Sequence, residues 1–424
     1  MNVKHDLSQK RLGRALARIV PWFVLGMILC TAVCQAQNEA SVAGTQIRSD
    51  LQQKLAPLIG PRDAVMVSHP NGAAMVAIHS ERLLIPASVL KIITSAAALE
   101  IMGDGYRFAT DFFETPSNDL KIKGYGDPMQ VSEELALIAA QLSEKIDRVE
   151  NVILDDSFFA QPMTIPGQGS SSEPYDAPNG ALCVNFNTVA FKRLQGRWIS
   201  AEDQTPLLPM AIEKIEASGL TSGRITLAAS AGEGLRYAGE LYRYFLTRAG
   251  ISIQGKVTFG TVDPRTDSLL LRYKSRFDLT MIVASLMAYS NNFIANQLLL
   301  AMGTQVHGPP ATLAKGRNVL HDYCNSKLAI SSPKIVEASG ISRRNRISAQ
   351  AMIKALDRFH PYRDLMRREG PQWYKTGTLN GIHTRAGYLC SKEGVDYRFV
   401  IMLNSAGKRT EPIMKIIKKC LLVE

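Results

Sequence analysis

The sequence predicts an α/β protein of the α+β type, with an antiparallel sheet flanked by helices and a mostly β insertion. Three observations carry this prediction. The turn signal Pro70-Asn71-Gly72 joins two apolar runs and indicates a β-hairpin. An almost uniformly apolar helix is expected at 86–103, and its apolar surface predicts burial on most sides. Short strand-like runs then alternate with turns until helical periodicity returns near residue 277.

The N-terminal residues are typical of an export signal. Basic residues up to Arg18 precede an apolar run over 19–33, and small residues follow as far as Ala36. The run contains Pro21 and is short for a membrane-spanning helix. We therefore expect a signal peptide over 1–36, cleavage near Ala36 and a periplasmic location, with an uncleaved anchor as the minor alternative.

Composition restricts the classes of function. With 424 residues, of which 46% are hydrophobic and 21% charged, the chain is long and apolar enough for two or three folded domains. The net charge of +11 suits work near anionic surfaces, but no basic stripe with interleaved aromatic residues indicates nucleic acid. The cysteines form no Cys-x-x-Cys pair and no phosphate loop is present, so we expect neither a metal nor a cofactor.

The first elements justify the sheet. A helix is expected over Thr45–Ile59, and the hairpin strands are Ala64–Ser68 and Ala73–His79. After the apolar helix, the insertion contains two helices, Ser132–Lys145 and Tyr237–Ala249. Its strands are expected at Asp119–Lys123, Asn151–Leu154, Cys183–Phe191, Arg224–Ala228 and Ile251–Phe259.

The last elements return to the pattern of the first. Apolar periodicity predicts helices at Phe277–Ala288, Phe293–Met302, 311–325 and 347–359. Strands separated by glycine-containing turns follow and suggest an antiparallel meander, at Trp373–Thr378, Thr384–Cys390 and Arg398–Leu403, before a helix at Pro412–Leu421. We expect one domain formed by 37–108 plus 275–424 and one or more mostly β domains inserted at 109–274.

Ser88 and Lys91 form the first candidate reactive pair. They lie three residues apart at the start of the apolar helix, so their side chains share one face. Burial disfavours an ammonium group and lowers its pKa, which would let Lys91 take the proton of Ser88. Serine is also a favoured helix cap, so this stretch alone leaves nucleophile and cap open.

Two further polar clusters interrupt apolar elements. Ser290-Asn291-Asn292 separates two apolar helices, and Lys375-Thr376-Gly377 lies in an expected strand. A glycine in a strand lets another backbone approach, as when a peptide pairs with a strand edge. An ordinary edge lysine that guards against aggregation is the alternative for Lys375.

In this order the three clusters resemble the Ser-x-x-Lys, Ser-x-Asn and Lys-Thr-Gly motifs of the penicillin-recognising serine peptidases and β-lactamases. The long insertion between the first two motifs resembles the D-alanyl-D-alanine carboxypeptidase/endopeptidase family, the class C low-molecular-mass penicillin-binding proteins. The segments 123–128, 153–158 and 338–343 also look like segments of that family. The resemblance implies a β-lactamase/transpeptidase-like fold.

The resemblance implies catalytic roles for matching residues. Ser88 would be the acylated nucleophile and Lys91 its base. Ser290 would relay a proton to the leaving group, and Asn292 would hold the substrate amide. Lys375 would help to bind the terminal carboxylate of the substrate.

The resemblance also implies substrate contacts. Thr376, Gly377 and Thr378 would line the bound peptide, and the backbone N–H groups of Ser88 and Thr378 would form the oxyanion hole. Asp155 is the matching position for an acid that contacts the amino group of the peptide's diamino acid. Its neighbour Asp156 is an alternative for that role.

These roles imply an exported serine DD-peptidase, a D-Ala-D-Ala carboxypeptidase with endopeptidase activity as a further option. It would act on peptidoglycan peptide stems, and β-lactam antibiotics would inhibit it covalently. A β-lactamase or esterase on the same fold and a non-catalytic wall-binding scaffold are the alternatives. We expect at most peripheral membrane contact. The chain departs from the family before Lys375, where 367–374 lacks the usual Gly-rich segment with Asp-Gly-Thr-Leu.

Overall fold

The computed structural model describes residues 44–330 and 333–422, so the expected signal peptide over 1–36 lies outside the described residues. Within these ranges, no helix combines the length and apolarity needed to cross a membrane. Of the described residues, 59–413 belong to one compact unit, and 44–58 with 414–422 belong to another.

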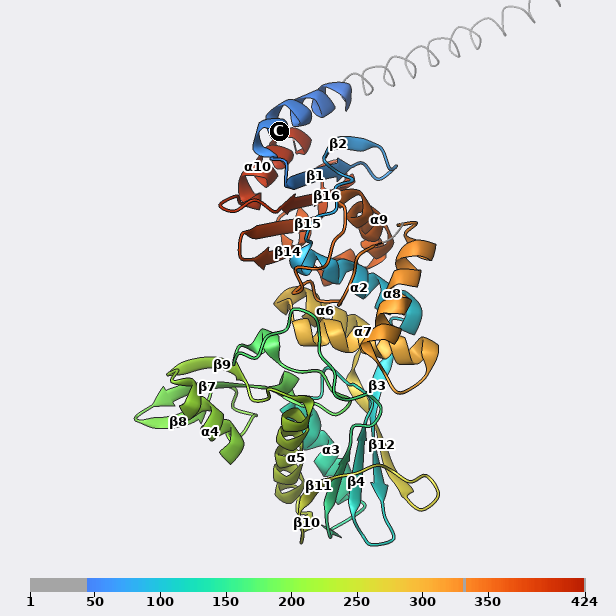
Figure 1. Cartoon of the computed structure of the whole chain (residues 1–424), viewed down its shortest axis with the longest axis vertical. Coiled ribbons are helices and arrows are strands. Elements are labelled where there is room, and N and C mark those ends of the chain that lie inside the picture. Colours follow the sequence, from blue (N-terminus) through green and yellow to red (C-terminus); the bar gives the residue numbers. More distant parts are fainter. Residues whose placement is uncertain (1–43, 331–332, 423–424) are drawn as a thin grey trace, which may run out of the picture. The chain divides into compact units, whose positions relative to one another are not determined.

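The central sheet has six antiparallel strands in the order β13-β14-β15-β16-β1-β2 (Figure 1). The predicted hairpin and the predicted meander are both confirmed, and the register Val65↔Ile401 places the early strand β1 beside the late strand β16. The strands are β1 (Asp63–Ser68), β2 (Ala74–Ile78), β13 (Arg367–Glu369), β14 (Gln372–Leu379), β15 (Ile382–Cys390) and β16 (Asp396–Leu403).

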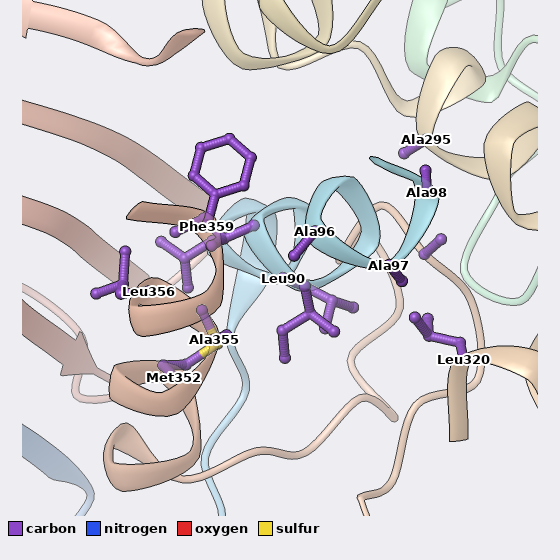
Figure 2. Close-up of a cluster of buried hydrophobic side chains, with 14 of the residues drawn as sticks. Leu90, Ala96, Ala97, Ala98, Ala295, Leu320, Met352, Ala355, Leu356 and Phe359 are labelled. Atoms are coloured by element: carbon purple, nitrogen blue, oxygen red, sulfur yellow. The ribbon is translucent and has the colours of Figure 1, made fainter. Parts of the chain in front are cut away.

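The apolar helix is α2 (Lys91–Met102), which continues the short turn η2 (Ala87–Leu90) and ends at Gly103 with φ of 88°. It packs against four later helices, α6 (Leu279–Tyr289), α7 (Asn292–His307), α8 (Leu313–Lys327) and α9 (Ala349–Phe359). Figure 2 shows why the contact is close, because consecutive alanines of α2 meet Ala295, Leu320 and the apolar face of α9. A polar group on this helix is therefore enclosed by packed side chains unless it lies at the helix end.

The segment between the first two motifs, called the insertion below, contains a five-stranded mixed sheet in the order β11-β6-β4-β3-β12 (Figure 1). The helices α3 (Ser132–Ser143) and α5 (Ala231–Arg248) pack on this sheet and on each other, and enclose a second cluster of buried apolar side chains. The strands are β3 (Arg107–Glu114), β4 (Leu120–Gly124), β6 (Val152–Asp155), β11 (Val257–Phe259) and β12 (Ser268–Asp278).

Smaller elements complete the insertion and the chain. One three-stranded sheet contains β7 (Thr188–Leu194), β8 (Arg197–Ser200) and β9 (Ser222–Thr226), and β5 (Arg148–Val149) pairs with β10 (Ser252–Ile253). The helix α4 (Pro209–Ser218) follows β8, although the sequence pattern did not predict it. The last element is α10 (Thr410–Leu421).

The strand expected at Cys183–Phe191 is wrong in its first half. Asn185, Phe186 and Asn187 all take left-handed φ values of 49°, 58° and 56°. Asparagine tolerates this conformation because its side chain can replace lost backbone bonds. Asn185 accepts from the N–H of Ser132, and Asn187 donates to the carbonyl oxygen of Pro178. These buried amides hold a turn where alternation of apolar residues suggested a strand.

The insertion contacts the helix that begins at the second motif. Gln297 of α7 is fully buried and donates to the carbonyl oxygens of Gly126 and Gly180, at 3.2 and 3.0 Å. Asn179 donates to Oε1 of Gln297 and to the carbonyl oxygen of Phe293 in the first turn of α7, both at 3.0 Å. Loops of the insertion thereby fix the start of α7.

Candidate active site

Ser88 lies in a tight turn between two glycines from distant segments. The preceding residue, Ala87, has a φ of 48°, a left-handed conformation that is strained for alanine. A Cβ atom on Gly340 would lie 1.9 Å from the carbonyl oxygen of Ala87, and one on Gly377 would lie 2.6 Å from the backbone nitrogen of Ser88. Both approaches require glycine, so the strained turn is held from two sides.

Lys91 is fully buried and lies against three oxygen atoms. Its Nζ is 3.0 Å from Oγ of Ser88, 2.7 Å from Oδ1 of Asn292 and 2.6 Å from the carbonyl oxygen of Ser339. Burial and the positive charge of Lys375 lower the pKa of Lys91 well below its usual value, and Glu337 opposes this shift.

The three contacts of Lys91 suit both the ammonium and the neutral amine. A neutral amine has two N–H donors and one lone pair. As an ammonium, Lys91 donates to all three oxygens. As a neutral amine it can keep the two shorter contacts, to Asn292 and Ser339, and turn its lone pair to the hydroxyl of Ser88. A general base needs this contact with the proton that it removes.

The second motif occupies the break between α6 and α7. Ser290 ends α6 with a left-handed φ of 56°, and Asn291 caps α7 by accepting the N–H of Ile294 at 3.1 Å. Asn292 begins α7, and because its Oδ1 faces Lys91, its Nδ2 points away from Lys91. The break thus presents two polar side chains at helix ends.

Lys375 connects the third motif to the second. Its Nζ donates to Oγ of Ser290 at 2.7 Å and to the carbonyl oxygen of Thr376 at 2.9 Å. Lys375 is 4% exposed, and this burial lowers its pKa to about 8. The two lysines therefore have different partners, with Lys91 on Ser88 and Asn292, and Lys375 on Ser290.

The rest of the third motif lies on an open strand edge. β13 pairs with β14 only as far as Arg367↔Tyr374, so within the described chain no strand pairs with the outer edge of β14 from Lys375 onward. Thr376 and Thr378 are exposed there, and Gly377 is buried against the Ser88 turn. An extended peptide binds to such an edge by strand addition.

Sequence reasoning missed Glu337 and Ser339. Both are fully buried, and the loop that they form supplies the carbonyl oxygen that accepts from Lys91. Thr94 of α2 donates to the carbonyl oxygen of Ala338, the residue before Ser339, at 2.7 Å. The one signal in the sequence was the segment 338–343, which resembled the family but carried no predicted catalytic role.

Asp155 lies apart from this group of contacts. It is fully buried at the end of β6, where it accepts from Nζ of Lys123 at 3.2 Å and from the N–H groups of Ser157 and Val262 at 2.9 and 2.8 Å. These partners belong to the insertion, and among the described residues none of its hydrogen bonds reaches the three motifs. Asp156 is half-buried.

The fold and the grouping of the three motifs define the class of penicillin-recognising serine peptidases. The chain belongs to the D-Ala-D-Ala carboxypeptidase 3 (S13) family, whose model matches residues 46–217 and 221–367. The matched ranges contain the first two motifs and end before Lys375. Membership confirms the resemblance drawn from the motifs and makes the chain a hydrolase of the serine D-Ala-D-Ala carboxypeptidase type.

Comparisons with individual proteins agree with this family. The chain is 24% identical to a D-alanyl-D-alanine carboxypeptidase of Actinomadura sp., over 90% of this chain and 85% of the relative. Its structure is similar to penicillin binding protein 4 of Haemophilus influenzae, with a TM-score of 0.68, 18% identity and coverage of 85% and 94% of the two chains. A predatory endopeptidase of Bdellovibrio bacteriovorus gives a TM-score of 0.52 at 18% identity, covering 84% and 91%. The two structures support the predicted fold.

Proposed function

We propose that this protein releases terminal D-alanine from peptidoglycan peptide stems through an acyl-enzyme on Ser88. The observation that carries the proposal is the position of Lys91. Its Nζ is buried, its pKa is lowered, and it lies 3.0 Å from Oγ of Ser88. A buried lysine held against a serine hydroxyl in this way is suited to act as the base for that serine.

Acylation begins with proton transfer from Ser88 to Lys91. As the O–H bond breaks, Oγ forms a bond to the carbonyl carbon of the penultimate D-alanine, and the proton becomes the third N–H of Lys91. The negative charge passes to the carbonyl oxygen, where the backbone N–H groups of Ser88 and Thr378 serve as the oxyanion hole. One such donor is typically worth about 10²–10³ in rate.

Departure of the leaving group needs a proton on its nitrogen. Ser290 passes this proton from Oγ as the C–N bond breaks and is reprotonated by the Lys91 ammonium, which returns Lys91 to its neutral form. Nζ of Lys375, 2.7 Å from Oγ of Ser290, stabilises the transient negative charge on that oxygen. Lys375, Thr376 and Thr378 also bind the carboxylate of the departing D-alanine, and Nδ2 of Asn292 binds the backbone carbonyl of the peptide. Water then hydrolyses the ester and restores the Ser88 hydroxyl.

β-Lactams fit the same site as covalent inhibitors. Their strained amide replaces the scissile peptide bond, and their carboxylate replaces the carboxylate of the terminal D-alanine. A structure of the similar H. influenzae protein contains a β-lactam, which supports this proposal. The acyl-enzyme with Ser88 would then persist because the leaving nitrogen stays tethered to the acyl group.

We propose two further features of the chain on the sequence patterns alone. Residues 1–36 direct export to the periplasm and are removed near Ala36. Residues 109–274 form the inserted part, and 37–108 plus 275–424 form the catalytic part. N-terminal sequencing of the protein from the cell envelope tests the first feature, since the mature chain should begin at Gln37.

A labelled penicillin tests the central proposal. Wild type should bind the label covalently, with the adduct on the peptide that contains Ser88, and should release D-alanine from a peptide that ends in D-Ala-D-Ala. Ser88→Ala should abolish both. Ser95→Ala is the matched control, because Ser95 is a buried serine of the same helix whose Oγ has no hydrogen-bond partner among the described residues. Covalent labelling of the Ser88→Ala variant would rule out Ser88 as the nucleophile.

A further inference from the structure

Glu337 is a buried carboxylate surrounded by hydrogen-bond donors. Its side chain is 0% exposed. Oε2 accepts from the N–H and Oγ of Ser339, at 2.7 and 2.6 Å, and from Nδ2 of Asn296 at 3.4 Å. Oε1 accepts from the N–H groups of Gly340 and Ser342, at 2.8 and 3.2 Å, and from Nδ2 of Asn345 at 2.6 Å.

These donors define the charge of Glu337. A protonated carboxyl group must donate one hydrogen bond, whereas an ionised one only accepts. Five of the six contacts come from N–H groups, which only donate. The sixth comes from the hydroxyl of Ser339, which can donate to Glu337 while it accepts the N–H of Ile341 at 3.2 Å. The pocket therefore holds an ionised carboxylate within the catalytic unit.

Glu337 contacts Ser339 directly and reaches the backbone of Asn292 through Asn296. Ser339 bonds to Glu337 through its N–H and Oγ, and its carbonyl oxygen accepts from Lys91 at 2.6 Å. Asn296 bonds to the same loop through its Oδ1, which accepts the N–H of Ala338 at 3.0 Å. Nδ2 of Asn296 also lies 3.3 Å from the carbonyl oxygen of Asn292, one turn earlier on α7.

The charge of Glu337 acts on the proton that Lys91 gains. Two charged groups act on the pKa of Lys91. The positive charge of Lys375 on β14 disfavours protonation of Lys91, and the negative charge of Glu337 favours it. The nearest partners, Ser88, Asn292 and Ser339, are neutral. During acylation Lys91 becomes an ammonium in a buried site, so a fixed negative charge nearby lowers the energy of that state.

We propose that Glu337 is a positioning residue of the active site, which holds the acceptors of Lys91 through Ser339 and Asn296 and balances the charge that Lys91 acquires. The inference rests on the proposed function, because it takes Lys91 as the base of acylation. It adds a fourth segment, the loop 337–345, to the three motifs.

The test measures the second-order rate constant of acylation by a fluorescent penicillin as a function of pH. Acylation requires neutral Lys91, so the rate rises with pH along an acid limb whose midpoint reports the proton affinity of Lys91. Glu337→Gln keeps the shape and removes the charge. It should move this midpoint to lower pH by about one unit and reduce the maximal rate about tenfold or more, because the Ser339 carbonyl is displaced.

Two further variants separate charge from loop packing. Ser339→Ala removes an O–H donor from Glu337 and leaves its charge less neutralised, so the midpoint should move to higher pH. Thr94→Val removes the contact between α2 and the Ala338 carbonyl without touching Glu337, so the midpoint should stay in place. Thermal unfolding of each variant shows whether it is folded.

The outcomes are distinct. Opposite shifts in Glu337→Gln and Ser339→Ala, with Thr94→Val unmoved, support the inference. A folded Glu337→Gln variant with the wild-type midpoint overturns it, and if that variant does not fold, an unmoved midpoint in Ser339→Ala overturns it. Wild type that no penicillin acylates through Ser88 at any pH refutes the proposed function as well.

Discussion

Lys375 and Ser290 lie on elements far apart in the sequence, yet Nζ of Lys375 is 2.7 Å from Oγ of Ser290. Burial lowers the pKa of Lys375 to about 8, and its hydroxyl partner carries no compensating charge. Lys375 is therefore mostly protonated only below this pH. A substrate carboxylate that binds beside Lys375 should lose its counter-charge as the pH rises through 8.

Acylation should accordingly show an alkaline limb with a midpoint near pH 8. Lys375→Arg keeps a positive charge to far higher pH, because the pKa of arginine lies well above that of lysine. Its maximal rate should fall, since a planar guanidinium does not reproduce the contact with Ser290. The pH profile of penicillin acylation checks this, and an alkaline limb that stays near pH 8 in the arginine variant would rule out Lys375 as its origin.

The sequence allowed prediction of those parts of the site that rest on local patterns. Asn71-Gly72 marked the hairpin, and a lysine on the apolar helix at position 91 was conspicuous because such helices are buried. Glu337 gave no local signal, since one acid in an irregular loop has no periodicity. Its role arises from donors that converge only in the folded chain. The turn at 185–187 was missed for the same reason, because its buried amides find partners at distant positions.

The close approach at Gly340 gives a second prediction. Gly340→Ala places a Cβ atom 1.9 Å from the Ala87 carbonyl oxygen and requires a φ of 86° from alanine. Overpacking of this kind costs about 1–3 kcal/mol of unfolding free energy, and displacement of the Ser88 turn should slow acylation more than 10-fold. Gly105→Ala is the control, because its Cβ would meet nothing within 4 Å. Equal melting temperatures and acylation rates in the two variants would show that the Ser88 turn does not depend on the close approach of Gly340.

Asp155 gives a third prediction, which separates a structural role from the substrate contact implied by the family. Burial raises the pKa of Asp155, but hydrogen bonds from Ser157 and Val262 and the charge of Lys123 outweigh burial and hold the pKa below its usual value. A lowered pKa means that the carboxylate stabilises the fold above the unfolded pKa of ~3.9. This contribution disappears as the pH falls through the lower, folded value.

Asp155→Asn should therefore lower the unfolding free energy by about 1–3 kcal/mol at neutral pH. Its deficit relative to wild type should shrink as the pH falls below about 4. Urea unfolding at several pH values measures this, together with KM for a peptide that carries a diamino acid. A variant with wild-type stability and a raised KM would instead favour the substrate contact.

Gln297 gives the fourth prediction, because it connects the insertion to the helix of the second motif. Gln297→Leu leaves the carbonyls of Gly126 and Gly180 without their donor, which should cost about 1–3 kcal/mol of unfolding free energy. Asn179 also loses its acceptor and holds the first turn of α7 less firmly, so Asn292 shifts and kcat should fall more than KM rises. Gln305→Leu is the control, since Gln305 lies exposed on the same helix. If the Gln297 variant loses stability while acylation and kcat match the control, the insertion stabilises α7 without positioning the second motif.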